Sequence, residues 1–207
     1  ISFSWNATTT WSSTSCGGVA GVTVPTTATN VIICATCTVT LTALGFCNNL
    51  TFDAAGAGST LQHNAGIPLL VGGNVTINGS TTADGTKLWN IGAGSASVTG
   101  NVTLNGGSTN ARIAQVNIAT GGTLNISGGL TYNAAGAARA VINMSTGTGV
   151  LNLAGALTVN NGTLTAGTLG STFNYNGTAA QTVRIGVSSI VYNNLHANNT
   201  SAAGATL

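Results

Sequence analysis

The chain contains the heptapeptide Val98-Thr99-Gly100-Asn101-Val102-Thr103-Leu104, and similar segments recur along the sequence at a nearly constant interval. The shared pattern is an apolar residue, a glycine two positions later, and an apolar-Thr-apolar triplet. Successive close copies are offset by 27, 28 and 27 residues, a period typical of repeat proteins. The other close copies occupy residues 71–77, 126–132 and 153–159, and looser copies occupy 46–52 and 191–197.

Two further patterns repeat in phase with the heptapeptide. One is an apolar-Asn-apolar triplet, and the other is an alternating segment that runs into the glycine motif. Short alternating runs separated by glycine-rich turns predict β-strands. Each repeat therefore holds three short strands. The triplets are Trp89-Asn90-Ile91, Val116-Asn117-Ile118, Ile142-Asn143-Met144 and Phe173-Asn174-Tyr175, and the clearest alternating segments are 123–126 and 150–153.

These repeats predict an all-β, right-handed parallel β-solenoid with about 27 residues and three short strands per rung. One repeat cannot bury its apolar face alone, whereas stacked repeats can. Each strand then pairs with its equivalent about 4.8 Å away, and parallel crossovers are almost always right-handed. An antiparallel sandwich is the competing fold, but it does not explain three patterns in phase. Two inward columns are predicted, Val75, Val102, Leu130, Leu157 and Ile77, Leu104, Tyr132, Val159, with Thr76, Thr103, Thr131 and Thr158 pointing outward.

The composition is polar but almost uncharged. Among 207 residues, only six are charged, there is no Glu, and the formal net charge is +2. Thr and Asn account for 35 and 24 residues, which disfavours helices and predicts outward Thr and Asn ladders. So weak a charge gives no reason to expect nucleic acid as a partner. No apolar run is long enough to predict a membrane span. Because Ile1 is not a start Met and the pattern runs to Leu207, we expect a mature or excised piece of a longer protein.

Three regions follow from the period. Residues 1–45 break it and predict an N-terminal cap with disulfides, residues 46–162 form regular rungs, and residues 163–207 form irregular C-terminal rungs. The last region has no run of charges to protect a free strand edge, so we expect it to dock onto another subunit or to continue into further sequence. The predicted assembly interface is Phe173, Tyr175, Val191, Tyr192 and Leu195.

All four cysteines lie in the first quarter of the chain: Cys16, Cys34, Cys37 and Cys47. An even number of clustered cysteines predicts two disulfides and an oxidising, extracellular compartment. We expect Cys16 to pair with Cys34, and Cys37 with Cys47. A zinc site of four thiolates is the alternative, although the spacing lacks a second CxxC pair.

Catalytic candidates are few. Polysaccharide-cleaving solenoids need carboxylates that converge on the substrate. The two acidic residues of this chain, Asp53 and Asp84, lie more than one repeat apart. Each is more simply interpreted as a turn residue. His63 and His196 are far apart in the chain and have no third partner in the sequence. We therefore expect no enzymatic activity, cofactor or metal.

Three cations precede the apolar-Asn-apolar triplet by similar intervals, so we expect them at one corner of the coil. These are Lys87, Arg112 and Arg139. They form a candidate basic ridge that would hold an anionic glycan or a neighbouring subunit's carbonyls. We favour the simpler interpretation, in which these residues are isolated charges that keep the surface soluble.

Several segments resemble the β-strand repeats of large secreted surface proteins of Bacteroidota, many of which are exported by type IX secretion. The resemblance covers most of the chain and implies an extracellular, adhesin-like or fibrous role, with no catalytic residues to carry over. The segments that carry it are Gly73-Asn74-Val75-Thr76-Ile77, Asn193-Asn194-Leu195, residues 173–183, Trp11-Ser12-Ser13 and Val31-Ile32-Ile33.

The sequence thus predicts a non-enzymatic extracellular structural protein, a subunit of a cell-surface fibre or an adhesin stalk that assembles end to end by strand stacking. Self-association is the expected partnership. The second hypothesis is an adhesin module that binds a glycan or surface through its Asn and Thr faces or the basic corner. The third is a solenoid polysaccharide hydrolase or lyase.

Overall fold

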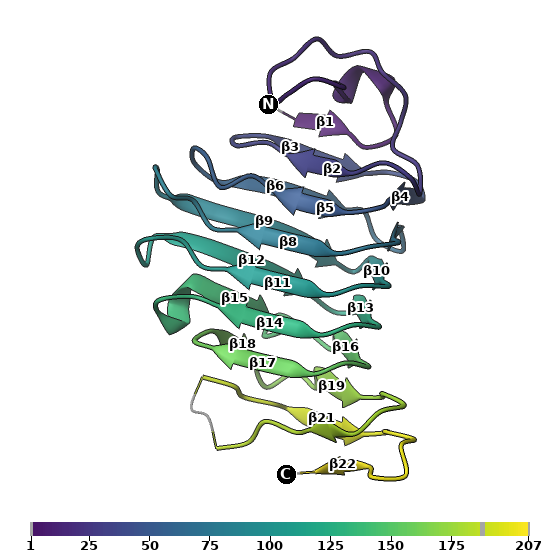
Figure 1. Ribbon diagram of the computed structural model, residues 1–207, viewed down its shortest axis with the longest axis vertical. Helices are drawn as coiled ribbons and strands as arrows, with labels where there is room; N and C mark the ends of the chain where they lie inside the picture. The colour runs from purple at the N-terminus through teal and green to yellow at the C-terminus, as the bar shows by residue number, and fades with distance from the viewer. Residues whose placement is uncertain (1, 187–188, 207) are drawn as a thin grey trace.

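The protein is a parallel β-solenoid. The computed structural model describes residues 2–186 and 189–206, and the strands wind into stacked rungs that form the tiers of Figure 1. A regular rung contributes one strand to each of three parallel sheets, here called B, A and C in the order in which the chain visits them. The predicted fold class and the three strands per rung are confirmed, while the hand of the coil stays a prediction.

Sheet B contains the copies of the heptapeptide motif. Val75, Val102, Leu130 and Leu157 are consecutive register partners, as predicted. Their apolar side chains alternate with threonines because successive residues of a strand face opposite sides of the sheet. The strands are β2 (Val31–Ile33), β5 (Leu50–Phe52), β8 (Val75–Asn78), β11 (Val102–Asn105), β14 (Leu130–Asn133) and β17 (Leu157–Asn160).

Sheet A contains the longest strands of the described chain, and Trp89, Val116 and Ile142 form one of its inward columns. The strands are β1 (Ser2–Ser4), β3 (Thr38–Leu41), β6 (Ser59–His63), β9 (Gly85–Gly92), β12 (Arg112–Ile118), β15 (Ala140–Asn143) and β18 (Thr163–Thr165).

Sheet C closes each rung, and a two-stranded sheet follows near the C-terminus. The strands of sheet C are β4 (Gly45–Cys47), β7 (Pro68–Val71), β10 (Ser95–Val98), β13 (Thr123–Ile126), β16 (Val150–Leu153), β19 (Thr172–Tyr175) and β21 (Asn194–Ala197). The small sheet pairs β20 (Gln181–Thr182) with β22 (Ala205–Thr206).

Helical structure in the described residues is limited to two short 3-10 turns, η1 (Thr8–Thr10) and η2 (Ala137–Arg139). In this part of the chain, no helix has the length and apolar character needed to cross a membrane.

One continuous apolar core runs along the inside of the coil. Val102 and Leu130 are fully buried, whereas Thr103 and Thr131 between the inward positions remain partly exposed. This confirms the predicted inside and outside of sheet B. Leucine, valine and isoleucine side chains stack rung upon rung, so each rung covers the apolar face of the next.

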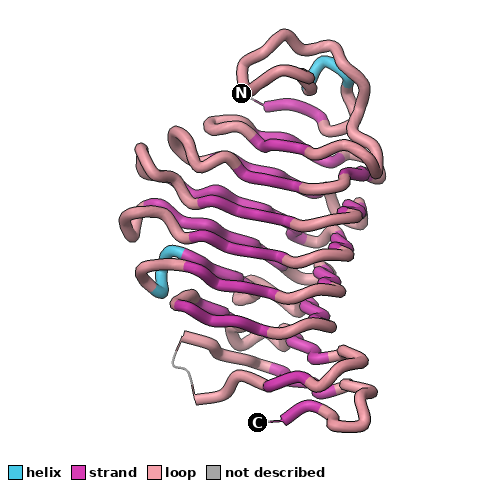
Figure 2. The backbone as a smooth tube through the Cα atoms, in the orientation of Figure 1, coloured by secondary structure: helices cyan, strands magenta, loops and turns pink. Residues whose placement is uncertain are grey.

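Loops between sheets B and A set the length of a rung. Three consecutive rungs carry six-residue loops there, at 79–84, 106–111 and 134–139, and these loops project from the left side of Figure 2. In the next rung, Asn161 and Gly162 alone connect β17 to β18. Asn161 has a φ of +79°, a conformation that Asn tolerates better than most residues. The side chain of any other residue at Gly162 would collide with the ring of Tyr132.

This short turn corrects the predicted alignment of Phe173-Asn174-Tyr175. Because the rung is shortened, Leu164 becomes the partner of Ile142 in sheet A. Phe173 instead pairs with Leu151 in sheet C, and the triplet continues the column of residues 151–153. The predicted alignment with Trp89 was therefore wrong, because a shortened turn lets every later segment reach a position further along its rung.

The late motif copy at 191–197 also lies outside its predicted sheet. Its strand β21 pairs with β19, so Leu195 is opposite Phe173 in sheet C rather than beyond Leu157 in sheet B. The motif letters alone do not assign a strand to a sheet, since the preceding loop lengths decide which side of the coil the segment reaches.

Within the predicted cap, stacking has already begun. Strands β2 and β3 lie before residue 45, and Val31 pairs with Leu50 in the same column as Val75. The chain before residue 31 arches over this end of the coil (Figure 1). Trp5 is fully buried there and packs edge-to-face against Trp11, with ring centroids 4.9 Å apart. The core is thus covered by an aromatic pair at its N-terminal end.

Candidate functional site

The three cations of the candidate ridge lie at the corner between sheets B and A, but Lys87 is fully buried. Its Nζ donates a hydrogen bond of 2.8 Å to the carbonyl oxygen of Ala55 in the preceding rung. Burial lowers the pKa of Lys87, and the nearby side chains of Asp53 and Cys37 oppose part of that shift. Lys87 therefore cannot belong to an exposed ridge, because its charge is directed into the coil.

Arg112 occupies the same corner one rung further along. Its Nε donates to Asp84 Oδ1 at 2.9 Å, and its Nη1 donates to the carbonyl oxygen of Thr81 at 2.7 Å. Nη1 also donates to Ser108 Oγ at 2.8 Å. Thr81 and Asp84 belong to the loop at 79–84 and Ser108 to the loop at 106–111, so one guanidinium joins two stacked loops.

Arg139 repeats the arrangement in the following rung. Its Nε donates to Asn110 Oδ1 at 2.9 Å, and its Nη1 donates to the carbonyl oxygen of Ser108 at 3.0 Å. The shared corner was predicted correctly, but the carbonyls that the cations hold belong to the preceding rung of the same chain. Lys87, Arg112 and Arg139 are called the corner clamps below.

His63 lies in the core at the end of β6 and is 2% exposed. Its Nε2 accepts a hydrogen bond of 2.9 Å from Trp89 Nε1, and its Nδ1 lies 3.1 Å from the carbonyl oxygen of Ile67. Since an indole N–H only donates, Nε2 must be unprotonated and Nδ1 must carry the proton. Burial lowers the pKa of His63 to about 4, so the ring is neutral near pH 7. His63 is therefore a satisfied core residue, and His196 lies on exposed β21.

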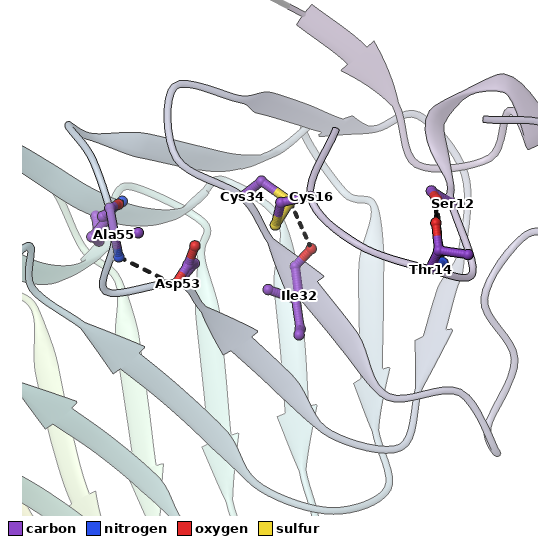
Figure 3. The surroundings of a disulfide bond; sticks show 8 residues. Ser12, Thr14, Cys16, Ile32, Cys34, Asp53 and Ala55 are labelled. Atoms are coloured by element: carbon purple, nitrogen blue, oxygen red, sulfur yellow. Dashed lines mark hydrogen bonds between the residues drawn. A yellow bond between two sulfur atoms is a disulfide. The ribbon is translucent and has the colours of Figure 1, made fainter. Parts of the chain in front are cut away.

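The two carboxylates serve local structure. Asp53 follows β5, and its Oδ1 accepts a hydrogen bond of 3.1 Å from the backbone N–H of Ala55, which closes a turn (Figure 3). Asp84 precedes β9 and pairs with Arg112. These positions agree with the turn roles predicted for both residues.

The predicted disulfide between Cys16 and Cys34 is confirmed, with a Cα–Cα distance of 5.6 Å. It ties the arching N-terminal segment to the end of β2, beside Ile32 (Figure 3). Because both thiols are oxidised, the alternative of a four-thiolate zinc site is wrong.

The predicted disulfide between Cys37 and Cys47 is wrong, since both are free thiols. Cys37 directly precedes β3, whose four residues span about 13 Å, whereas a disulfide needs Cα atoms within about 7 Å. Cys47 lies beyond that strand, in sheet C, with its side chain in the core. Burial raises the pKa of the Cys47 thiol to about 12, so it stays protonated.

The predicted assembly residues divide into two groups. Phe173 and Tyr175 are buried, and the Tyr175 and Tyr192 hydroxyls are hydrogen bonded at 3.0 Å. Val191 and Leu195 are 53% and 36% exposed. The aromatic residues therefore fill the end of the core, and only the two aliphatic residues of the predicted set are available as a surface.

Asparagine ladders, expected from the composition, follow the stack. In sheet B, Asn133 Nδ2 donates to Asn105 Oδ1 at 3.0 Å, and Asn105 Nδ2 donates to Asn78 Oδ1 at 2.8 Å. Sheets A and C carry equivalent ladders, such as Asn117 to Asn90 at 2.8 Å and Asn152 to Asn125 at 2.8 Å. Each rung is thereby joined to the next by side-chain as well as backbone hydrogen bonds.

Two surface hollows accompany these features. One, of about 350 Å³, lies between β17 and β20 and includes Arg184. The other, of about 420 Å³, lies on the outer face of sheet B across β2, β5 and β8 and is lined by uncharged residues such as Asn30, Thr51 and Thr76. Within residues 2–186 and 189–206, no three His, Cys, Asp or Glu side chains gather in a way that suits a metal ion.

No family model matches the chain, and no curated protein or solved structure gives a significant match. The link to Bacteroidota surface repeats and type IX secretion therefore stays a prediction. The fold and one disulfide stand on the structure alone, and the disulfide is compatible with a secreted or extracellular protein.

Proposed function

We propose that the chain is a non-enzymatic extracellular structural protein, a rigid solenoid rod that serves as an adhesin stalk or as a subunit of a cell-surface fibre. The observation that carries this proposal is the internal use of its ionisable side chains. The corner clamps bind carbonyls of the preceding rung, Asp84 completes one clamp, and His63 fills the core. These groups strengthen the axis of the rod.

Continuous stacking supports a mechanical role. Six or seven strands pair in register in each of the three sheets, and each sheet also carries an Asn ladder. Extension along the axis must break backbone and side-chain hydrogen bonds in all three sheets. The low charge of the surface also allows rods to lie side by side with little repulsion.

Assembly in this proposal begins at β21. All four residues of this strand are exposed, Leu195 among them, and Val191 adds apolar surface just before it. A further strand from a second copy would pair with the backbone of β21 and cover both side chains. Trp5 and Trp11 cover the opposite end of the core, which favours a stalk with one closed end over a fibre that grows from both ends.

The polysaccharide hydrolase or lyase hypothesis gains no support from Asp53 and Asp84, because each is engaged in a turn or a clamp. The hypothesis of a glycan held at the basic corner loses Lys87, which is buried.

Small-angle scattering and electron microscopy of the purified chain, with a panel of polysaccharides, test the proposal. We expect elongated particles, alone or joined end to end, and no release of sugars. Compact isometric particles would contradict the rod, and depolymerisation of any polysaccharide would contradict the non-enzymatic role.

A further inference from the structure

The outer face of sheet B carries an unbroken column of one residue type. Five consecutive strands place a threonine at the same register position, and parallel neighbours are about 4.8 Å apart. On the first strand of the sheet, Ile32 occupies this position and is 56% exposed. The column is Thr51, Thr76, Thr103, Thr131 and Thr158, called the threonine column below.

The hydroxyls of this column have no protein partner among the described residues. Neighbouring hydroxyls repeat at about the strand spacing of 4.8 Å, beyond the reach of a direct hydrogen bond. The flanking residues Asn78, Asn105 and Asn133, in contrast, bind one another along the stack. The face therefore presents a regular row of free hydroxyls and methyls beside amides that are already fixed in place.

Strand propensity by itself does not require this uniformity. Threonine suits any outward strand position, yet the central outward columns of the other two sheets are mixed. In sheet A the register partners are Thr60, Leu88, Gln115 and Val141, and in sheet C they are Leu70, Ser97, Asn125 and Asn152.

The chemistry of the face narrows the kind of partner. Sugar-binding surfaces commonly offer an aromatic ring, but neither the threonine column nor its flanking asparagines include one. No charged residue occupies the threonine column, so an ionic partner has nothing to pair with. A partner that suits the column is itself uncharged, periodic and able to both donate and accept hydrogen bonds at each repeat.

We propose that the outer face of sheet B binds ice. Each threonine hydroxyl anchors one water, and the rigid sheet holds these waters in a row whose spacing is fixed before contact. The methyl groups cannot form hydrogen bonds, so they reduce the number of ways in which water can bind between neighbouring hydroxyls. Such preorganisation removes much of the entropic cost of ordering the layer, and weak contacts add over five rungs.

Partition of the protein into a slowly growing ice hemisphere, with recrystallisation inhibition as a second readout, tests the proposal. We expect the unaltered chain to enter the ice and to slow recrystallisation. Thr103→Tyr, in the middle of the column, should reduce both effects at least tenfold, because a large ring keeps the neighbouring hydroxyls away from the lattice. Thr103→Val keeps the shape and removes one hydroxyl, so it should cause a smaller loss.

Gln115→Tyr is the matched control, because Gln115 lies outward on sheet A in the rung of β12. It should leave ice binding unchanged. Melting temperatures show that each variant is folded, and Thr131→Tyr replaces Thr103→Tyr if the latter is not. Exclusion of the unaltered chain from ice, or an equal loss in Gln115→Tyr, would overturn the proposal. Binding on a glycan array that Thr103→Tyr abolishes, without ice binding, would assign the face to a sugar instead.

This inference and the rod proposal fail separately. Scattering reports the rod whether or not ice is bound, and the ice assay does not depend on how the copies assemble.

Discussion

At the scale of single residues, burial decides which polar groups can act. Lys87, His63 and Cys47 are among the most reactive side chains in the composition, and all three are at most 2% exposed. Lys87 binds a carbonyl, His63 is fixed in its neutral tautomer between Trp89 and Ile67, and Cys47 stays a thiol. Each has become part of the packing of the coil.

His63 should make the protein sensitive to acid. Between the unfolded pKa of 6.5 and the folded value of about 4, the unfolded chain binds a proton that the folded chain does not. The free energy of unfolding therefore falls as the pH drops through this window, by about 3 kcal/mol in total. Denaturant titrations from pH 4 to 8 measure it, and His63→Gln should flatten the curve. An equally steep curve in the variant would assign the loss to other groups.

The two free cysteines should differ in reactivity. In the folded protein, iodoacetamide should modify half-buried Cys37 and spare Cys47, whose thiol is buried and protonated. Cys47 should react once denaturant is added. Peptide mapping without reductant should also recover the bridge between Cys16 and Cys34. A peptide that joins Cys37 to Cys47 would contradict the structure.

At the scale of the elements, alternation within each strand separates two environments that are one residue apart. In β14, Leu130 faces the core and Thr131 faces solvent, and the same holds for Val102 and Thr103 in β11. Both β11 and β14 also lie between two neighbouring strands, so a side chain that does not fit its column disturbs contacts with the rungs on both sides.

Leu130→Asp should destabilise the protein severely, by about 4 kcal/mol or more, because it buries an unpaired charge. Thr131→Asp should cost less than about 1 kcal/mol, since the carboxylate stays in water. Denaturant unfolding followed by circular dichroism measures both changes. A larger loss for Thr131→Asp would mean that the inner and outer faces of sheet B are reversed.

At the scale of the whole molecule, stability is a sum over rungs and their interfaces, because each rung contacts mainly its neighbours. The regular repeat ends at the short turn of Asn161 and Gly162. Beyond it the rung is shorter, and β20 and β22 form a separate two-stranded sheet. The N-terminal end is held by Trp5 and by the bridge from Cys16 to Cys34.

Removal of one complete rung should leave a folded rod. Deletion of residues 103–130 joins Val102 to Thr131, which continues the same strand position because Val102 and Leu130 are register partners. The product should melt cooperatively and be shorter by about 4.8 Å. Deletion of residues 103–116 joins Val102 to Asn117 of sheet A and should prevent folding. Small-angle scattering measures the length of the two deletion products, and thermal melts measure their stability. Equal stability of both products would contradict the in-phase stacking.

The sequence by itself determined the solenoid, the three strands per rung and the inward columns between residues 71 and 159. Glycine turns and period-two alternation are local signals, and a constant offset lets them align without knowledge of the rest of the chain. The threonine column was visible in the same way. The sequence did not show that its hydroxyls lack protein partners, because this depends on the distance between neighbouring strands.

Only the tertiary structure decided the roles of Lys87, Cys37, Cys47 and Phe173. Lys87 is on the expected corner, but whether its side chain meets water or the carbonyl of Ala55 depends on a loop 32 residues earlier. Cys37 and Cys47 are near in sequence, yet an extended strand separates them. Phe173 changed sheets because the two-residue turn at Asn161 shortened one rung. The loops between strands decided the positions of Lys87 and Phe173, and the length of the intervening strand decided the separation of the two cysteines.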